Sequence, residues 1–513
     1  MSVALTTAQT ARRQRFAFVL LCLTRFMVVL DASVVNVALP SMQHDLGLST
    51  QALQWVVSAY SLTFGGFLLL SGRAGDLFGR RRLLIVGLAL FSLASLAGGF
   101  ASSSIWFITT RAIQGLGAAL VAPTTLSLIA TLFAEGPERN KACGIMGSIT
   151  SSGFAVGALL GGLLVASPGW RWVMFINVPI GVLAIALAPI LLEESGAQAE
   201  QRHIDVLGAA VITTGLIALV AVLGEGNVLG WLSWQAIGLF VLALVLILAF
   251  VSIELRSPAP LVRLGIFRLG TLSGGDMVGL LGPAAFVSLL FMLTLYMQKV
   301  LGYSAVETGL AFLPMALTLM VVSNLASRLV ARISVKSVLV GGMVIITFGL
   351  LFFTRMSTTG TFLGMLLPAM LIVAIGLGCV FPAMFIAGTA GVSNNEQGLA
   401  SGLLNTAQQV GAAIGLAITT TIATGRTTVL LRSGASSGAA LVGGFQSAIF
   451  VCAGFAIAAA LIAMVVIREH ECTQSLANPS LAEHCHSARP FAIHIPHVAL
   501  RYSSTSVSSE IER

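Results

Sequence analysis

Long apolar runs, separated by short charged or turn-rich breaks, follow one another along most of the chain. A helix that crosses the hydrocarbon core of a bilayer needs about 20 mostly apolar residues, and these runs have about that length. The pattern predicts fourteen membrane-spanning helices, and because this number is even, both termini are expected on the same side of the membrane. The runs lie at about 16–39, 52–71, 82–102, 105–131, 142–166, 172–192, 206–223, 233–253, 272–297, 307–328, 336–354, 361–388, 399–422 and 440–467.

The composition excludes an ordinary soluble protein. Hydrophobic residues make up 57% and charged residues 9% of the 513 residues, whereas a soluble domain carries about 25% charged residues. Such a chain cannot cover a folded surface with charge, which rules out a soluble enzyme and a nucleic-acid-binding domain. We therefore expect an all-α, multi-pass membrane protein embedded in a lipid bilayer.

The basic residues indicate the orientation of the chain. If the N-terminus lies inside, 20 of the 27 Lys and Arg residues fall on the inner side, five on the outer side and two within spans. This asymmetry follows the positive-inside rule, so we expect both termini in the cytoplasm and the protein in the cytoplasmic (plasma) membrane. The net charge of +8 then reflects topology, and no nucleic-acid partner is expected.

The two ends of the chain add no catalytic or metal-binding feature. The first apolar run is longer than the h-region of a signal peptide, so no cleavable signal is expected. The tail at 468–513 is polar and Ser-rich, which predicts a disordered cytoplasmic segment. Its His and Cys residues match no closed metal site, and the Cys spacings suggest no disulfide framework. We expect neither a metal nor a cofactor.

Asp31 and Arg111 are oppositely charged residues at similar predicted depths. Asp31 precedes Pro40 by nine residues, roughly 13 Å along a helix, and Arg111 lies roughly 9 Å into the fourth span. Ionisable groups inside a membrane are costly and usually functional. Protonation of Asp31 would release the pair and bias the conformation. We interpret both as proton-coupling residues; a static structural ion pair is the alternative.

The loop between the second and third spans has the pattern Gly-x3-Asp-x2-Gly-Arg-Arg, formed by Gly72, Asp76, Gly79, Arg80 and Arg81. Gly79 permits a tight reversal of the chain, and Asp76 can cap the next helix or pair with an Arg. An acid beside several bases allows an interface to lock and unlock. We therefore expect a gating loop in which Asp76 and Arg80 form the inner latch; a simple positive anchor is the alternative.

With these segments in view, the chain resembles the major facilitator superfamily, and within it the fourteen-span drug:proton antiporters. The resemblance covers about 16–467. It implies two six-helix bundles around a central cavity, alternating access, and a link between Arg111 and proton coupling. The segments similar to family motifs lie at 30–40, 71–82, 111–119, 170–181 and 399–405.

The fifth span departs from the family pattern at one position. Exporters usually carry Gly-x3-Gly-Pro-x2-Gly-Gly in this span, and here Ala158 replaces the Pro. The fixed bend of Pro is lost, but the glycines still predict close helix packing. Packing alone is another reading of these glycines, and it is compatible with an exporter. The retained residues are Gly153, Gly157, Gly161 and Gly162.

A faint internal repeat fits this architecture. The segment at 80–87 is echoed at 336–341, which makes the tenth and eleventh spans counterparts of the second and third. We therefore predict an N-terminal six-helix bundle at 1–192, two inserted spans at 193–255, a C-terminal six-helix bundle at 256–467 and the tail at 468–513.

We interpret the protein as a secondary active transporter that uses protons to export hydrophobic or cationic small molecules, as multidrug and antibiotic exporters do. Asp276, near the inner end of the ninth span, fits a second proton site, a cation contact or simply a helix-end residue. A substrate cavity for varied apolar molecules needs aromatic, Met and small polar side chains; the candidates are Tyr60, Gln114, Phe154, Met292, Tyr296 and Asn405.

Two other functions stay open. A uniporter or importer of a specific small metabolite would accumulate its substrate, so the direction of flux distinguishes it from an exporter. An inner-membrane component of a tripartite complex, without pump activity of its own, would need a periplasmic adaptor as partner, and the short outer loops offer little surface for one. A membrane enzyme fits poorly, because no paired catalytic acids or nucleophile motif is visible.

Overall fold

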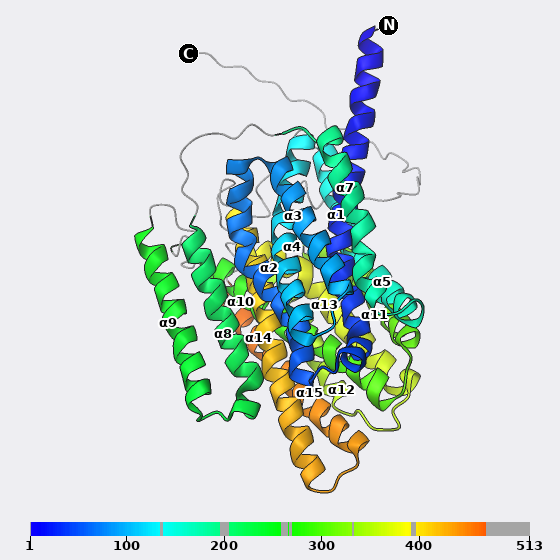
Figure 1. The fold of residues 1–513 in the computed structure, drawn as a ribbon, viewed down its shortest axis with the longest axis vertical. Helices are drawn as coiled ribbons and strands as arrows, with labels where there is room; N and C mark the ends of the chain where they lie inside the picture. Colours follow the sequence, from blue (N-terminus) through cyan, green and yellow to red (C-terminus); the bar gives the residue numbers. More distant parts are fainter. Residues whose placement is uncertain are drawn as a thin grey trace, which may run out of the picture.

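The computed structural model is a bundle of long helices that run roughly along one direction (Figure 1). It describes residues 2–133, 137–194, 205–257, 265, 269–330, 333–390 and 397–467, and these contain no β-strand. The structure does not describe every side chain within these helices. The side chains of Asp76 and Phe154 and the surroundings of Gly72 are outside the description. We call the end from which the N-terminus projects in Figure 1 the upper end, and the opposite end the lower end.

The first part of the chain forms seven helices, of which the last two share one predicted span. They are α1 (Ser2–Leu46), α2 (Thr50–Phe78), α3 (Arg80–Gly99), α4 (Ser104–Leu132), α5 (Pro137–Ala166), α6 (Arg171–Phe175) and α7 (Asn177–Leu191). Two further helices follow, α8 (Val206–Leu229) and α9 (Trp234–Arg256).

The rest of the described chain forms α-helices with two π-helical turns. They are α10 (Gly270–Leu295), η2 (Tyr296–Val300), α11 (Ala305–Val330), α12 (Val335–Phe353), η3 (Phe362–Leu366), α13 (Leu367–Gly388), α14 (Gln397–Arg432) and α15 (Ser437–Val466).

The predicted membrane spans coincide with these helices. Thirteen described helical segments are long and apolar enough to cross a membrane. The other predicted run, 142–166, lies within α5, where Val156–Ala166 counts as a shorter apolar helix. The predicted fold class, an all-α membrane protein, is confirmed, whereas the borders between its domains stay a prediction.

Serine residues start several of the helices. A helix leaves its first N–H groups without partners, and a serine at the N-cap accepts a hydrogen bond from one of them. The Ser49 hydroxyl accepts from the Ala52 amide at 3.0 Å, and Ser103 accepts from Trp106 at 3.3 Å. The same cap begins α9, α12 and α15. The polar breaks in the sequence therefore act as helix start signals.

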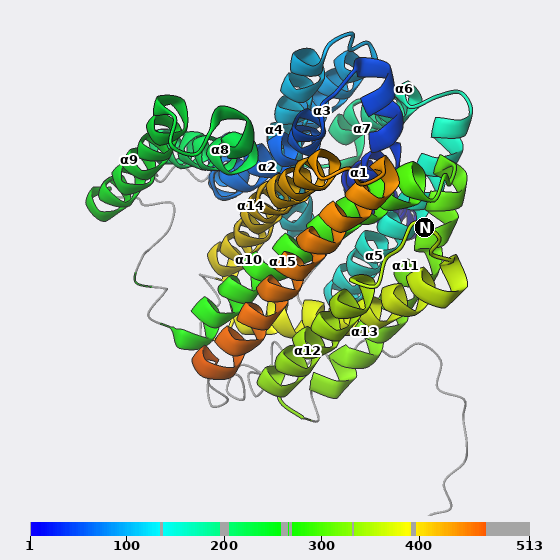
Figure 2. The ribbon, with the colours of Figure 1, turned by 90° about the horizontal axis from the view of Figure 1, so that it is seen from below.

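The early and late helices meet along two seams. On one side α2 packs against α14, and on the other α5 packs against α11. The pair α8 and α9 lies at one side of the bundle, with α9 outermost (Figures 1 and 2). Helix α8 contacts both α2 and α14, so it covers the first seam.

Hydrogen bonds attach α8 to both sides of this seam. The Trp55 indole of α2 donates to the Glu225 carboxylate of α8 at 3.2 Å. The Asn227 amide donates to the Thr421 carbonyl of α14 at 2.7 Å, and the Thr421 hydroxyl donates to the Leu223 carbonyl at 2.6 Å. These contacts lie toward the end of α8, which is at the lower end of the bundle (Figure 1).

The lower end is also closed at the second seam. A Cβ added at Gly309 of α11 would lie 2.4 Å from the Ala158 carbonyl of α5, so the two backbones are in direct contact. Nearby, the Gln298 amide of η2 donates to the Val37 carbonyl of α1 at 3.0 Å. Small residues allow this close approach of membrane helices. The two groups of helices are therefore joined at the lower end.

Candidate functional site

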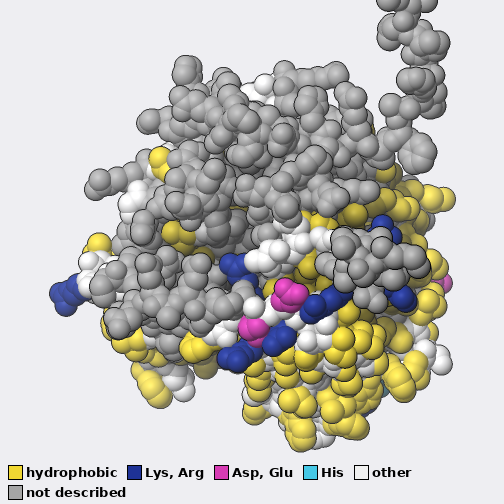
Figure 3. Space-filling model, turned by 90° about the horizontal axis from the view of Figure 1, so that it is seen from above, with side chains coloured by type: hydrophobic (Ala, Val, Ile, Leu, Met, Phe, Trp, Pro, Cys, Tyr) yellow, Lys and Arg dark blue, Asp and Glu magenta, His cyan; other side chains and the backbone are white. Residues whose placement is uncertain are grey.

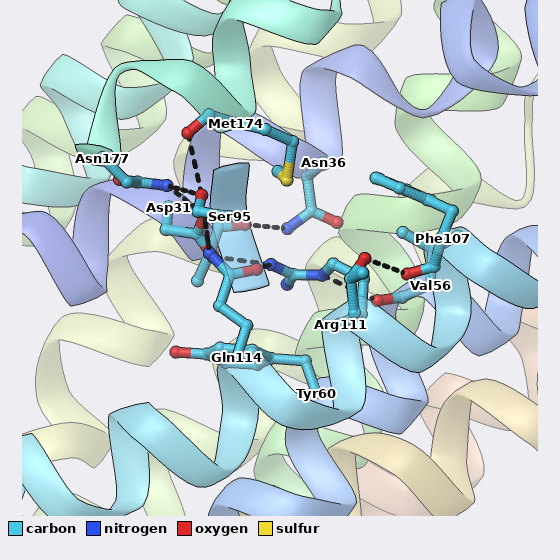
Figure 4. A network of polar contacts seen from close by, with 12 residues as sticks. Asp31, Asn36, Val56, Tyr60, Ser95, Phe107, Arg111, Gln114, Met174 and Asn177 are labelled. Carbon is cyan, nitrogen blue, oxygen red and sulfur yellow. Dashed lines mark hydrogen bonds and ion pairs between the residues drawn. The ribbon is translucent and has the colours of Figure 1, made fainter. Parts of the chain in front are cut away.

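A buried polar network joins four helices of the N-terminal part (Figure 4). Asp31 comes from α1 and Ser95 from α3, while Arg111 and Gln114 come from α4 and Asn177 comes from α7. Arg111 and Gln114 are three residues apart, so they lie on the same face of their helix. All five side chains are buried.

The centre of the network is an ion pair. The Arg111 guanidinium Nη1 lies 2.7 Å from Asp31 Oδ2, and the side chains are 2% and 0% exposed. Two isolated charges at this depth would be very costly, and each offsets the cost of the other only if further hydrogen bonds are made. The predicted pairing of Asp31 with Arg111 is present in the structure.

The second carboxylate oxygen of Asp31 accepts two more hydrogen bonds. The Gln114 and Asn177 side-chain amides each donate to Oδ1 at 2.8 Å. Together with Arg111, three donors converge on one carboxylate. Each donor comes from a different residue, so the three hydrogen bonds fix the position of the carboxylate between α1, α4 and α7.

Arg111 keeps contacts that do not involve the acid. Its Nε donates to the Val56 carbonyl of α2 at 3.2 Å, and its Cζ lies 4.4 Å from the centre of the Tyr60 ring. The ring face attracts a cation by its quadrupole. Arg111 also donates to the side-chain amide oxygen Oε1 of Gln114. The guanidinium therefore has partners that would remain if Asp31 lost its charge.

Ser95 connects the network to the end of α6. Its hydroxyl accepts from Asn177 at 3.0 Å and from Gln114 at 3.3 Å, and donates to the Met174 carbonyl at 2.8 Å. The Tyr60 hydroxyl and Asn177 Oδ1 are buried without a hydrogen-bond partner in the described part of the chain. The network is therefore strongly held around Asp31 and incomplete at its edge.

Sequence reasoning did not select Asn177 or Ser95 as site residues, although Asn177 lies in the motif segment 170–181. The predicted span 172–192 is split in the structure, with α6 ending at Phe175 and α7 beginning at Asn177. Pro179 has no N–H to donate to the Phe175 carbonyl, which favours a break at this point. The break at Pro179 is a signal that could have drawn attention to Asn177; Ser95, in an ordinary apolar helix, offers none.

The predicted cavity residues are not all brought together. Gln114 belongs to the network described above, and the Tyr60 ring of α2 lies against Arg111 of that network. Met292 and Tyr296 lie in the core of the C-terminal part, where the Tyr296 hydroxyl donates to the Ser357 carbonyl at 2.6 Å. The Asn405 amide of α14 donates to Ser401 of its own helix at 2.8 Å. The side chain of Phe154 lies outside the described residues.

The exporter-motif glycines of α5 face two helices. Gly153, Gly157 and Gly161, four residues apart, lie against α1, where a Cβ at Gly157 would be 2.7 Å from Ser33 Cβ. Gly162 faces α11 instead, and a Cβ added at Gly162 would lie 2.7 Å from the Ala305 carbonyl. The glycines thus set the approach of α5 both to the helix that bears Asp31 and to the other half.

The predicted gating loop is a single-residue turn. Gly79, with φ +92°, separates α2 from α3. A Cβ added at this position would lie 2.3 Å from a carboxylate oxygen of Glu194. A side chain at this φ is strained. Arg80 donates to the Ser127 carbonyl of α4 at 3.2 Å. Gly72 and Asp76 fall in the last turns of α2. The surroundings of Gly72 and the side chain of Asp76 lie outside the described part of the structure.

Glu194, which sequence reasoning did not select, holds the start of α3. Its carboxylate accepts from the Arg81 backbone amide at 3.2 Å and from the Arg81 side chain at 3.3 Å, and Arg82 lies 3.7 Å away. Beside it, Arg13 pairs with Glu193 at 3.0 Å. Acidic side chains among basic ones are visible on the upper face (Figure 3). These contacts join the turn to the segment that follows α7.

The chain matches one family profile and several curated proteins. The profile described as Major Facilitator Superfamily matches residues 21–416. The puromycin resistance protein pur8 of Streptomyces alboniger is 40% identical over 458 residues, which cover 88% of this chain and 90% of that protein. The cephamycin export protein CmcT of Amycolatopsis lactamdurans is 39% identical over 79% of this chain and 84% of that protein.

Among solved structures, a bacterial homolog of the human lysosomal transporter Spinster, in an inward-facing and unoccupied conformation, has a similar fold. The TM-score is 0.61 and the identity 16%, and the match covers 90% of this chain and 98% of that one. At this identity the similarity concerns the fold alone.

Proposed function

Because this chain belongs to the major facilitator superfamily, we propose that it exports hydrophobic or cationic small molecules, antibiotics among them, in exchange for protons. Membership makes the chain a multi-pass integral membrane protein and a secondary transporter, not an enzyme. The observation that carries the proton coupling is the buried pair of Asp31 and Arg111, 2.7 Å apart, with two further donors on the carboxylate.

The relatives support the direction of transport and the class of substrate. One is named for puromycin resistance and another for cephamycin export. A third, the tetracenomycin C resistance and export protein of Streptomyces glaucescens, is 33% identical over 76% of this chain. The three names refer to three different compounds, so they favour export of antibiotics without selecting one substrate for this chain.

In the proposed cycle, Asp31 accepts a proton and loses its attraction for Arg111. The proton removes the negative charge that three donors stabilise, and Arg111 retains only its contacts with Val56, Gln114 and the Tyr60 ring. The network joins four helices of one half, so its rearrangement would shift their packing. That shift would bias the bundle between conformations open to opposite sides.

The two ends of the bundle would open in turn. The lower end is closed through Gln298, Gly162 and Gly309, and these contacts would break when that side opens. At the upper end we propose that the turn at Gly79, held by Glu194 and joined to α4 through Arg80, acts as the gating loop. The basic upper end fits the cytoplasmic side, which would place both termini in the cytoplasm and the protein in the cytoplasmic membrane.

The test is ethidium transport in inside-out membrane vesicles. Wild type is compared with Asp31→Asn, with and without a proton uncoupler. The matched control is Asp45→Asn, which removes another acid of α1 that pairs with Arg171 near the lower end and does not touch the network. Size-exclusion profiles of each variant establish that the protein is folded.

We expect uptake that the uncoupler abolishes, that Asp31→Asn loses and that Asp45→Asn keeps. Proton-driven uptake at the wild-type rate in Asp31→Asn would remove Asp31 from the mechanism. Ethidium leaving the vesicles would instead indicate an importer. If transport required a co-purifying periplasmic adaptor, the hypothesis that the protein pumps on its own would be wrong. The protein would then be a component of a tripartite complex.

A further inference from the structure

A second buried acid lies outside the network. Asp276 is the only ionisable residue of α10 (Gly270–Leu295). It is 3% exposed, and neither of its carboxylate oxygens has a hydrogen-bond partner in the described structure. Asp276 lies six residues after the start of α10, roughly 9 Å along the helix. The helix dipole favours an anion only in the first turn, so it does not stabilise a carboxylate at Asp276.

The helices around Asp276 are closely packed. A Cβ at Gly275 would lie 2.4 Å from the Gly388 amide of α13, and a Cβ at Gly279 would lie 2.6 Å from Leu404 of α14. One turn earlier, Leu272 belongs to an apolar cluster that includes Leu403. This part of α10 is thus packed closely against backbone and apolar side chains of α13 and α14.

The neighbouring helices bring few titratable groups. Helices α13 and α15 contain no charged residue and one cysteine each, Cys379 and Cys452. In α14 the charged residues are Arg426 and Arg432, in its last two turns at the lower end. Asp276 lies near the upper end, so these cations are at the far side of the bundle.

The other described elements that pack against α10 do not supply a counter-charge either. In η2 the titratable groups are Tyr296 and Lys299, at the lower end. Helix α1 carries Arg25 and Asp31 within its membrane-spanning part, and neither has a hydrogen bond or ion pair with Asp276 in the described structure. The other charged or titratable residues of α1 with described side chains are Arg12, Arg13, Arg15, Cys22, His44 and Asp45.

We propose that Asp276 is a second exchangeable proton site, protonated in this conformation, in the opposite half of the molecule from Asp31. An anion without donors in an apolar site is costly, and the group avoids that cost by keeping its proton. When water reaches the site during the transport cycle, the O–H bond breaks, the proton passes to water and the carboxylate remains. The step rests on the proposed antiport and adds a proton to it.

The test is infrared spectroscopy of the purified full-length protein in micelles of an alkyl glycoside detergent, which has no carbonyl group of its own. A protonated carboxyl group has a C=O stretch that an ionised carboxylate lacks. We expect this band in wild type and in Asp31→Asn, and its loss in Asp276→Asn. If Asp276→Asn does not fold, Asp276→Leu serves the same comparison. The Asp45→Asn variant, which lacks another acid, should keep the band.

A band that is missing from wild type, or that persists in Asp276→Asn, would overturn the proposal. The coupling role has its own readout, the number of protons exchanged per ethidium in proteoliposomes, which should fall by one in Asp276→Asn. An unchanged ratio alongside a lost band would overturn the coupling role. These results are distinct from failure of the proposed function, which would appear as the absence of uncoupler-sensitive transport in wild type.

Discussion

Asp31 of α1 and Asp276 of α10 are both buried acids, and their surroundings are opposite. Asp31 accepts hydrogen bonds from Arg111, Gln114 and Asn177. Asp276 accepts none in the described structure. Both are nearly inaccessible to solvent, at 0% and 3% exposure. Equal burial therefore goes with very different hydrogen bonding at these two carboxyl groups.

The difference teaches how one chain can hold two acids for different tasks. Around Asp31, charge is balanced by charge, so a proton that arrives there disturbs four helices. Around Asp276 the described residues supply no hydrogen-bond partner, so a proton that leaves would create an unbalanced charge. In the mechanism we propose, the first site responds to protonation and the second to deprotonation. Variants that remove a partner, or the acid itself, can test this contrast.

The largest effect is expected when Arg111 loses its partner. Asp31→Leu leaves a buried guanidinium with neutral contacts only, which should lower the free energy of unfolding by about 3–5 kcal/mol and abolish proton-driven transport. Denaturant unfolding in detergent micelles measures the first quantity, and vesicle uptake measures the second. A loss below about 1 kcal/mol would mean that the ion pair does not dominate the site.

Removal of one donor should have an intermediate effect. Asn177→Ala deletes one of the two hydrogen bonds to Asp31 Oδ1, and a hydrogen bond to a charged group contributes about 1.5–3 kcal/mol. Transport should weaken without being lost. The control is Asn36→Ala in α1, because the Asn36 amide donates only within its own helix, to the Ala32 carbonyl at 2.9 Å. Equal losses of stability in the two variants would argue against a special role for Asn177.

Removal of both charges should restore most of the stability. The double variant Asp31→Leu/Arg111→Leu leaves no unpaired ion, and such replacements are often neutral, so we expect it within about 1–2 kcal/mol of wild type. Proton-driven uptake should stay absent. Stability no better than that of Asp31→Leu alone would contradict the view that the single variant fails through an orphaned charge.

The smallest effect is expected at Asp276. Because no donor loses a partner, Asp276→Leu should change the free energy of unfolding by less than about 1 kcal/mol, in contrast to Asp31→Leu. The same denaturant titration measures the difference. A destabilisation as large as that of Asp31→Leu would show that Asp276 has a structural partner, and the contrast between the two acids would be lost.

The helices could be predicted closely because hydropathy reports the part of a helix that lies in lipid. The predicted run 272–297 corresponds to Gly270–Leu295 and η2, and 336–354 corresponds to Val335–Phe353. The agreement is poorer where a helix leaves the bilayer. Helix α14 continues to Arg432, ten residues past the predicted end at 422, because polar residues continue the backbone hydrogen bonds without extending the apolar run.

For the site, the sequence predicts only how deep along each helix a residue lies. Counting residues from a helix end gives depth, which was enough to match Asp31 with Arg111. It gives no lateral position, because that depends on how helices rotate and pack. Ser95 and Glu194 were therefore not selected, and the contact of Gln114, selected as a cavity residue, with Asp31 was not foreseen. The predicted roles of the gating and cavity residues stay predictions.

Helix α8 is hydrogen-bonded to α2 through Trp55 and to α14 through Thr421, across the seam between the early and late helices. If the halves rock against each other, these bonds must stretch or exchange at every turnover. A lipid-soluble compound that binds beside Glu225 and Asn227 of α8 would then slow transport without occupying the substrate pathway. Its inhibition would be noncompetitive, and raising the drug concentration would not relieve it.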